Sequence, residues 1–334
     1  MERFYAIFHA RNMEFIRDRG SFIWNLIFPV VLVFGLAFAF GGGGESVFTV
    51  GYSGADLEAA EESYEFFALE HVEFVPYEDL SEGVSRVRYH QIDMMIDLTE
   101  REYYVNESAN TGYLAERLLQ GESPGRFTRQ AVTGRPIRFV DWIVPGIIGM
   151  NMMFSGVFGV GFVLVRYRKN GVLKRLKATP IGALQFVSAQ VASRFVIVLI
   201  TSIFVFTATN IFLNFMMLGS YLLLLLLTML AVFCIISLGL IFASRIKSEE
   251  LASGLINLVT LPMILLSGVF FSLEGAPEIL NTISQALPLT YFVDGARSIM
   301  LEGAGVAELA PNFLILGGFT AVFLVVASLL FRWE

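Results

Sequence analysis

The sequence predicts a polytopic α-helical membrane protein with six transmembrane helices and a small external α/β domain inserted between helices 1 and 2. The first observation behind this prediction is composition: 55% of the 334 residues are hydrophobic, 16% are charged and the mean hydropathy is +0.66. Soluble domains usually carry about 25% charged residues. The second is six windows without Asp, Glu, Lys or Arg, and the third is the stretch 41–141, of ordinary composition, between the first two windows.

Each charge-free window is close to the length of a transmembrane helix. A helix rises 1.5 Å per residue, so about 20 residues cross a bilayer core of about 30 Å. Because lipid offers the backbone no hydrogen bonds, such runs are stable there as helices. The windows are Phe22–Phe40, Trp142–Val165, Phe195–Leu213, Tyr221–Ala243, Leu251–Leu273 and Asn312–Phe331.

The segment before the first window, residues 1–20, has apolar side chains at helical spacing among arginines. It is predicted to be a cytoplasmic amphipathic elbow helix, followed by transmembrane helix 1 over residues 21–40. The apolar run is longer than that of a signal peptide, and Gly41–Gly44 offers no clear cleavage site, so we expect this span to be retained.

Charge assigns the two sides of the membrane. Six spans put both termini on one side, where the sequence has fourteen basic and six acidic residues. On the other side, residues 41–141 carry eight basic and nineteen acidic residues, and residues 274–308 carry one and five. Short cytoplasmic loops are enriched in Lys and Arg. We therefore expect cytoplasmic termini, a cytoplasmic segment at 166–190 and an external, acidic domain at 41–141.

The segment 41–141 alternates strand-like and helix-like patterns, which is typical of a small α/β module. His71 and His90 have no metal-ligand spacing with Cys or with each other, and Cys234 is the only cysteine. We expect neither a metal site nor a disulfide. The expected elements are Val47–Tyr52, Ala55–Leu69, Val72–Pro76, Tyr77–Tyr89, Ile92–Leu98, Glu102–Val105 and Gly112–Arg129, the last helical at first and a loop after Gly121.

Residues 142–334 are expected to hold transmembrane helices 2–6 and two special segments. The first, at 166–190, contains a basic amphipathic stretch that ends at Pro180, either a helix lying on anionic lipid or a docking helix for a partner. The second, at 273–311, is too long for a hairpin and too polar for another span. Within it Asp294 and Arg297 stand three residues apart, a spacing that permits pairing on one helical face.

Three stretches together resemble the type-2 ABC exporter permeases, and their order around six spans makes the resemblance specific. That family also carries an α/β domain between its first two spans in long-loop members. One departure concerns residues 166–170, which are basic and polar where family members often have an acidic residue, so a salt bridge to an ATPase there is in doubt. The stretches are Asp141-Trp142-Ile143-Val144-Pro145-Gly146 with Gly149–Gly161, then Gly171–Pro180, and then Leu261–Phe271 with Leu287–Arg297.

The resemblance implies a permease subunit that works as a homodimer or a related heterodimer with two copies of an ABC ATPase subunit. It assigns the cytoplasmic motif to ATPase coupling, the second and fifth spans to a translocation cleft, and 273–311 to a re-entrant external cap. The coupling residues are Gly171, Val172, Leu173, Lys174, Arg175, Leu176, Lys177, Thr179 and Pro180. The cleft candidates are Asn151, Phe154, Gly156, Phe158, Asn257 and Pro262, and the cap candidates are Pro288, Tyr291, Asp294 and Arg297.

The sequence contains no ATP site of its own. The phosphate-binding pattern G-x-x-x-x-G-K-[ST] does not occur, and there is no Gly-Lys pair. The chain is therefore expected not to be an enzyme by itself and to hold no cofactor, with ATP and Mg on the partner subunit. The other expected partners are the lipid bilayer and a periplasmic or cell-wall partner of the external domain, and none is a nucleic acid.

We expect a bacterial cytoplasmic (inner) membrane protein that exports a hydrophobic or amphipathic substrate by alternating access. Two rivals stay open: an ATPase-independent channel or scramblase, and a subunit of a membrane assembly or signalling complex that transports nothing. An ion-driven transporter is disfavoured because such proteins place ionisable residues within their spans, and the six windows have none.

Overall fold

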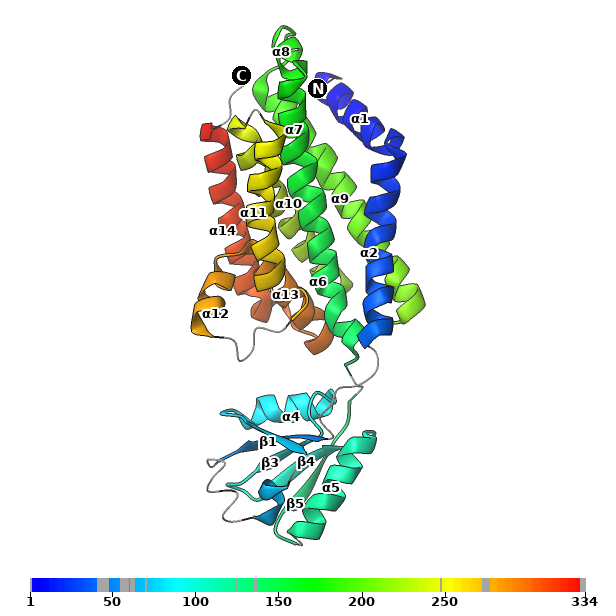
Figure 1. Cartoon of the computed structure of the whole chain (residues 1–334), viewed down its shortest axis with the longest axis vertical. Helices are drawn as coiled ribbons and strands as arrows, with labels where there is room; N and C mark the ends of the chain where they lie inside the picture. Colours follow the sequence, from blue (N-terminus) through cyan, green and yellow to red (C-terminus); the bar gives the residue numbers. More distant parts are fainter. Residues whose placement is uncertain are drawn as a thin grey trace. The chain divides into compact units, whose positions relative to one another are not determined.

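A computed structural model of the chain describes residues 2–40, 48–54, 60, 64–69, 71–123, 125–134, 137–246, 248–271 and 277–330. They form two compact units (Figure 1). One comprises Met1–Ala39 and Phe139–Glu334 and is helical; the other, Phe40–Arg138, is an α/β domain. The division lies within three residues of the expected 41–141.

Among its described residues, the helical unit contains five helices that are long and apolar enough to cross a membrane. A sixth span results if α1 and α2, which meet at a bend of 61°, are counted as one. The six expected spans thus correspond to five or six candidates. The helices are α1 (Glu2–Arg17), α2 (Arg19–Phe40), α6 (Phe139–Met153), α7 (Gly159–Lys169), α8 (Val172–Lys177), α9 (Ala183–Leu213), α10 (Tyr221–Arg245), α11 (Glu249–Leu266), α12 (Glu278–Gln285), α13 (Pro288–Arg297) and α14 (Val306–Leu330).

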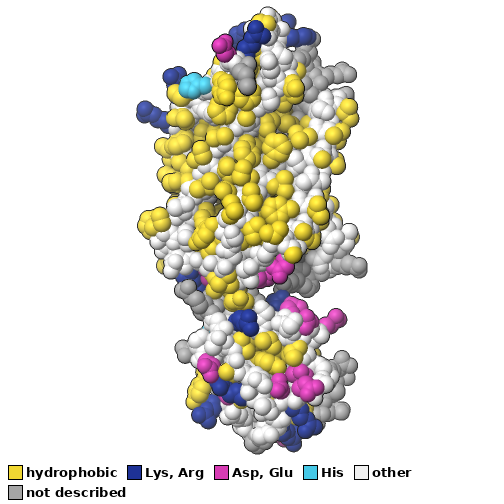
Figure 2. Space-filling view, turned by 180° about the vertical axis from the view of Figure 1, so that it is seen from behind, with side chains coloured by type: hydrophobic (Ala, Val, Ile, Leu, Met, Phe, Trp, Pro, Cys, Tyr) yellow, Lys and Arg dark blue, Asp and Glu magenta, His cyan; other side chains and the backbone are white. Residues whose placement is uncertain are grey.

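Helices α6 and α7 form one continuous 31-residue span, Phe139–Lys169, joined by the π-helical turn η2 (Phe154–Phe158). This span and α10 lie at the centre of the unit. In the most apolar stretch of the α6–α7 span 78% of the residues are buried, against 17% in that of α14. The peripheral helices turn apolar side chains outward, and Figure 2 shows them covering the wide middle of the unit, with Lys and Arg gathered at the end that carries α8. Such an apolar surface fits contact with lipid.

The end of α10 is closed by an arginine from the neighbouring helix. Nη1 of Arg168, on α7, donates to the carbonyl oxygens of Ala243 at 2.9 Å and Ile246 at 2.6 Å, and Nη2 donates to that of Ser244 at 3.1 Å. A helix leaves its last carbonyl groups without intrahelical partners, and a cation there is favourable. Arg168 therefore has a structural role at the end of α10.

Two predicted boundaries differ from the structure. The expected fifth span, Leu251–Leu273, is helical only to Leu266, where the chain leaves α11. The expected cytoplasmic segment 166–190 contains the end of α7, the six-residue α8 and the first two turns of α9, which begins at Ala183. Arg194 directly precedes the third charge-free window and was counted among the fourteen basic residues of the cytoplasmic side, but it lies inside α9.

The α/β unit has one five-stranded mixed sheet of order β2-β1-β3-β4-β5, in which only β3 and β4 run antiparallel. Val50 lies opposite Phe74 and Met94, which fixes the register at the centre. β5 was not expected from the sequence, where 122–129 was predicted to be a loop. The strands are β1 (Phe48–Ser53), β2 (Val72–Pro76), β3 (Met94–Asp97), β4 (Glu102–Asn106) and β5 (Thr128–Val132), with a 3₁₀ turn η1 (Glu65–Ala68) and helices α4 (Leu80–Arg88) and α5 (Asn110–Glu122).

The two faces of this sheet carry separate cores. α5 covers a cluster that includes Phe66 and Phe67, whereas α4 covers a smaller one around Met95. Asp79 caps α4 by accepting from the Ser81 backbone N at 2.9 Å, and the two hydrogen bonds from Ser81 hold the pKa of the Asp79 carboxyl below its usual value. The expected helix Ala55–Leu69 lies mostly outside the described residues.

Candidate functional site

The helical unit contains a cavity of about 640 Å³ that we call the arginine cavity. It lies between α1 and α2 on one side and the α6–η2–α7 span on the other, and Arg194 of α9 and Ser253 of α11 complete its wall. Pockets that hold small molecules usually measure about 300–1,000 Å³. Its size is therefore that of a ligand site.

Three predicted cleft residues line this cavity: Asn151, Phe154 and Phe158. The two rings lie 5.9 Å apart, centroid to centroid. The lining positions of the span follow one another at about four-residue intervals, 150–151, 154–155, 158–159, 162–163 and 166. An α-helix has 3.6 residues per turn, so a stripe spaced by four would drift; the π-helical turn η2 adds a residue and holds the stripe in line.

Gly156, also predicted in the cleft, is not among the residues that line the arginine cavity. A Cβ atom at Gly156 would lie 2.7 Å from Cγ2 of Ile235, which belongs to α10. The glycine therefore permits close approach of two helices. Neither Asn257 nor Pro262, on α11, is among the residues that line the arginine cavity; Asn257 is half-buried and Pro262 is exposed.

Arg194 supplies a buried positive charge to the cavity. Its Nε donates to the Ser155 carbonyl oxygen at 2.5 Å, Nη2 lies 3.5 Å from the Ser155 hydroxyl, and the guanidinium carbon lies 5.5 Å from the Phe15 ring centroid. Gly159 makes room for this arrangement, because a Cβ atom there would overlap the guanidinium. By sequence alone, Arg194 was predicted only as one of the cytoplasmic basic residues. It is, however, the only charged residue between Lys177 and Arg245, and that isolation is the signal that was missed.

Arg11 joins the elbow helix α1 to α7 at the rim of the same cavity. Its Nη1 lies 2.8 Å from Oε2 of Glu14, and Nη2 donates to the Gly159 carbonyl oxygen at 3.3 Å. The Tyr167 hydroxyl donates to Glu14. Arg11 therefore has a carboxylate partner, Glu14. Among the described residues, the contacts of Arg194 do not include a carboxylate.

The predicted coupling helix α8 is short and follows α7 directly. Gly171 precedes it with a φ of 67°, the left-handed region that glycine adopts readily. Leu173, one of the predicted coupling residues, is 1% exposed, so its side chain anchors α8 to the subunit and is not open to a docking partner. The exposed residues are Lys174, Arg175, Lys177, Thr179 and Pro180, while Val172 and Leu176 are half-buried. What α8 presents is mainly positive charge.

The basic run before α8 is largely used within the subunit. Arg168 caps α10, and Nζ of Lys169 lies 3.5 Å from Oε1 of Glu249 on α11. The departure from the family pattern at 166–170 thus coincides with internal contacts.

All four predicted cap residues lie on α13. Arg297 donates from Nε to the Trp142 carbonyl oxygen at 3.2 Å and from Nη2 to that of Gly268 at 2.5 Å, and its guanidinium carbon stands 3.7 Å from the Trp142 ring centroid. The Tyr291 hydroxyl donates to the Gln285 carbonyl oxygen at 2.8 Å. Pro288 begins α13 and is buried, whereas Asp294 is exposed. Arg297 thus ties α13 to α6 and to the end of α11.

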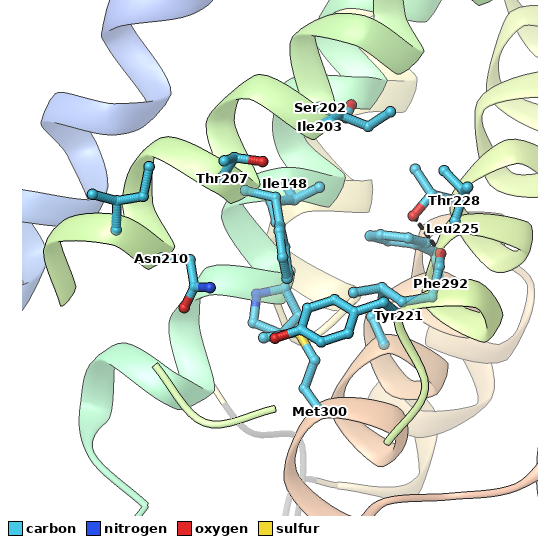
Figure 3. A pocket seen from close by; sticks show the side chains of 15 residues that line it. Ile148, Ser202, Ile203, Thr207, Asn210, Tyr221, Leu225, Thr228, Phe292 and Met300 are labelled. Carbon is cyan, nitrogen blue, oxygen red and sulfur yellow. Dashed lines mark hydrogen bonds between the residues drawn. The ribbon is translucent and has the colours of Figure 1, made fainter. Parts of the chain in front are cut away.

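A second cavity, of about 480 Å³, was not expected from the sequence. Figure 3 shows it between α9, α10, α6 and the α13–η3 segment, η3 being the turn Ser298–Glu302. Its polar groups are mostly hydroxyls, so we call it the hydroxyl cavity. Thr228, for example, donates its hydroxyl to the Leu224 carbonyl oxygen at 2.7 Å. No charged residue is among those that line it.

Apolar helices around a polar cavity, with a basic helix at one end, define a polytopic membrane permease. The chain belongs to the ABC-2 type transporter family, which residues 104–301 match. Permeases of this family are membrane subunits without an ATPase site of their own, and the sequence has no phosphate-binding loop.

Several curated proteins are similar to the chain. The inner membrane transport permease YhhJ of Escherichia coli (strain K12) is 29% identical over 183 residues, which is 54% of this chain and 49% of that protein. The probable multidrug ABC transporter permease YbhS of the same strain is 23% identical over 176 residues, 52% of this chain and 47% of YbhS. The linearmycin resistance permease protein LnrN of Bacillus subtilis (strain 168) is 24% identical over 176 residues, with 52% and 46% covered. The chain spans about half the length of these relatives.

Proposed function

We propose that this chain is the membrane permease of an ABC exporter, a dimer of permeases driven by two copies of a separate ABC ATPase. The cargo is a hydrophobic or amphipathic molecule, and it moves outward by alternating access. The observation that carries the proposal is the span Phe139–Lys169, which lines the arginine cavity and leads directly into α8. The span that lines the cavity is therefore joined to the exposed basic helix by the short turn at Gly171.

The proposed coupling follows from this continuity. The ATPase docks on the basic surface of α8, and closure of the ATPase pair tilts α8 and α7 together, because Leu173 fixes α8 to the subunit. Movement of α7 shifts Phe158 and Gly159 against α1 and Arg194, which changes access to the cavity. ATP binding can drive this change only if the ATPase binds the two conformations with different affinity.

The membrane orientation is part of the proposal. The excess of basic residues on the side of α8 and both termini supports a cytoplasmic location for them, and the acidic balance of 41–141 supports an external α/β unit. We further propose a bacterial inner membrane, by similarity to the name of YhhJ, and a periplasmic or cell-wall partner for the α/β unit. YbhS is named a probable multidrug permease and LnrN a linearmycin resistance permease, and these names support an organic cargo over an inorganic ion.

Charge reversal on α8 tests the coupling. In the triple variant Lys174→Glu, Arg175→Glu, Lys177→Glu, we expect at least a tenfold loss of the turnover that the permease stimulates in its partner ABC ATPase. The reason is that three favourable charge contacts become repulsive, and like charges that face each other across an interface cost several kcal/mol. The measurement is co-purification and ATP turnover in proteoliposomes.

The matched control is the variant Arg117→Glu, Arg126→Glu, which reverses two charges in the α/β unit. It should leave ATP turnover unchanged. Full turnover and assembly in the α8 variant would favour a helix that merely lies on lipid. Transport of a fluorescent amphiphile without any ATPase or ATP would instead favour the channel or scramblase.

A further inference from the structure

The inner wall of the arginine cavity carries three buried polar side chains close together. Asn151, Ser155 and Arg194 are 6%, 2% and 7% exposed. Asn151 and Ser155 stand four residues apart on one face of the span, and Arg194 reaches the same turn through its bond to the Ser155 carbonyl oxygen. These groups form a polar spot on this wall. Charged side chains also line the cavity, where Glu14 is paired with Arg11, and Asp18 and Arg166 complete the set.

Two of these groups lack the partner that their burial calls for. Within the described part of the chain, Nδ2 of Asn151 has no hydrogen-bond acceptor. The partners of Arg194 there are a carbonyl, a hydroxyl and a ring, none of them a carboxylate. Buried donors are normally hydrogen-bonded and buried charges normally paired, because desolvation is otherwise uncompensated. An anion with acceptor oxygens satisfies both groups at once.

The remaining walls favour an apolar chain. Phe15, Phe28, Phe154 and Phe158 line the cavity, and Trp24 stands at its opening with 65% of its surface exposed. On a helix that faces lipid, such an opening admits a molecule from the bilayer. A free inorganic anion would gain nothing from these rings, since they contribute by burial of apolar surface.

We propose that the arginine cavity binds an amphiphile with an anionic head group. The head accepts hydrogen bonds from Arg194 and from Nδ2 of Asn151, and the apolar chain lies along the rings of Phe28 and Trp24. The identification of this amphiphile as cargo rests on the proposed export function; the binding site itself does not.

Trp24 provides the measurement. The sequence has three tryptophans, so the variant Trp142→Phe, Trp333→Phe keeps Trp24 as the only one. The full chain in detergent, without ATPase or nucleotide, is titrated with 9,10-dibromostearate and with its neutral amide, because bromine quenches indole fluorescence at contact. We expect saturable quenching by the carboxylate at about tenfold lower concentration than by the amide, the effect of one hydrogen bond to a charged group.

Variants locate the head group. Asn151→Leu removes an unpartnered donor without breaking a hydrogen bond within the chain, so the protein should fold and bind the carboxylate about tenfold more weakly. Arg194→Gln should do the same and Arg194→Lys should retain binding; if Arg194→Gln does not fold, Asn151→Leu decides. The matched controls are Asn210→Leu in the hydroxyl cavity and exposed Arg19→Gln, which should bind as the parent does.

Further arms of the titration identify the source of the head group. Tighter quenching by dibrominated phosphatidylglycerol than by dibromostearate assigns the site to a two-chain bilayer lipid, the reverse order assigns it to a single-chain molecule, and either supports the proposal. Equal quenching by carboxylate and amide, equal weakening in the Asn210→Leu control, or displacement of dibromostearate by millimolar inorganic phosphate overturns it. Since no ATPase is present, a failed export assay leaves these results untouched.

Discussion

The two cavities of the helical unit are similar in size and opposite in chemistry. The arginine cavity, about 640 Å³, has a buried cation without a carboxylate partner and an amide donor without an acceptor. The hydroxyl cavity, about 480 Å³, is lined by apolar and uncharged polar side chains, and its buried Ser202 and Thr228 hydroxyls each donate to the carbonyl one turn earlier. Both volumes lie in the range of small-molecule pockets, so volume alone does not decide which cavity is the ligand site. The difference lies in which polar groups still need a partner, and that points to the arginine cavity as the ligand site.

The contributions of the two cavities to the free energy of folding lead to the same conclusion. Ser and Thr hydroxyls that bond their own helix cost little in lipid. A buried guanidinium and an orphan amide cost stability, and proteins commonly keep such costs where function requires them. The arginine cavity should therefore respond to substitution in binding and stability together, whereas the hydroxyl cavity should respond only in packing.

The largest effect is expected from Gly159→Val. The added Cβ atom overlaps the Arg194 guanidinium, which must leave its hydrogen bond to Ser155. Removal of a partner from a buried charge costs about 3–5 kcal/mol, so the melting temperature in detergent should fall sharply and amphiphile binding should be lost. Thermal unfolding followed by intrinsic fluorescence measures this.

Gly254→Val is the matched control, because a Cβ atom at Gly254 meets nothing within 4 Å and the helix-propensity change is the same. The double variant Gly159→Ala, Arg194→Ala should be less destabilised than the sum of its single variants, since the overlap is removed with the side chain. Similar losses in Gly159→Val and Gly254→Val would mean that Arg194 moves without cost and that the polar spot is not a fixed structure.

The intermediate effect is expected from filling each cavity with a large ring. Asn151→Trp should reduce export of a fluorescent amphiphile by about tenfold or more, because the ring occupies the space of the ligand. Leu225→Trp, in the hydroxyl cavity, should leave export within about twofold. Export by inside-out vesicles at equal protein level is the measurement, with Leu314→Trp, on the exposed face of α14, as the control for bulk alone. Loss of export in Leu225→Trp but not in Asn151→Trp would assign the route to the hydroxyl cavity.

Hydropathy alone was sufficient to predict long apolar helices, because a bilayer requires long uncharged helices whatever their neighbours. It did not predict every end, since the fifth expected span is helical only to Leu266. The directions of side chains within them could not be read in the same way. Gly156 was expected in the cleft, but the π-helical turn η2 shifts the helical phase, and the glycine faces α10. Leu173 shows a related limit: an amphipathic pattern identifies an apolar face, and only the fold shows whether that face meets the subunit's own core or a partner.

Arg194 shows what composition can hide. The positive-inside count included it with the loop residues, where an arginine is ordinary. Its place eleven residues into α9 became visible only once the helix was seen to begin at Ala183. The strand β5 was missed for another reason. Its alternation is weak because it lies at the edge of the sheet, where Thr128 and Arg129 are exposed and only Val132 is buried.

The smallest effect, and the one that separates the two cavities most cleanly, is expected from Asn151→Leu. An unpartnered buried donor costs about 1–3 kcal/mol, and a leucine of similar size removes that cost. The melting temperature should therefore rise by a few degrees while affinity for an anionic amphiphile falls, a gain of stability with a loss of function. Asn210→Leu in the hydroxyl cavity makes the same chemical change on a half-buried side chain, and it should alter neither quantity by much. Thermal unfolding with and without dibromostearate measures both, because a ligand that binds the folded state raises the melting temperature. If Asn151→Leu lowers the melting temperature of the free protein, its amide stabilises the fold, and the contrast between the cavities loses its main support.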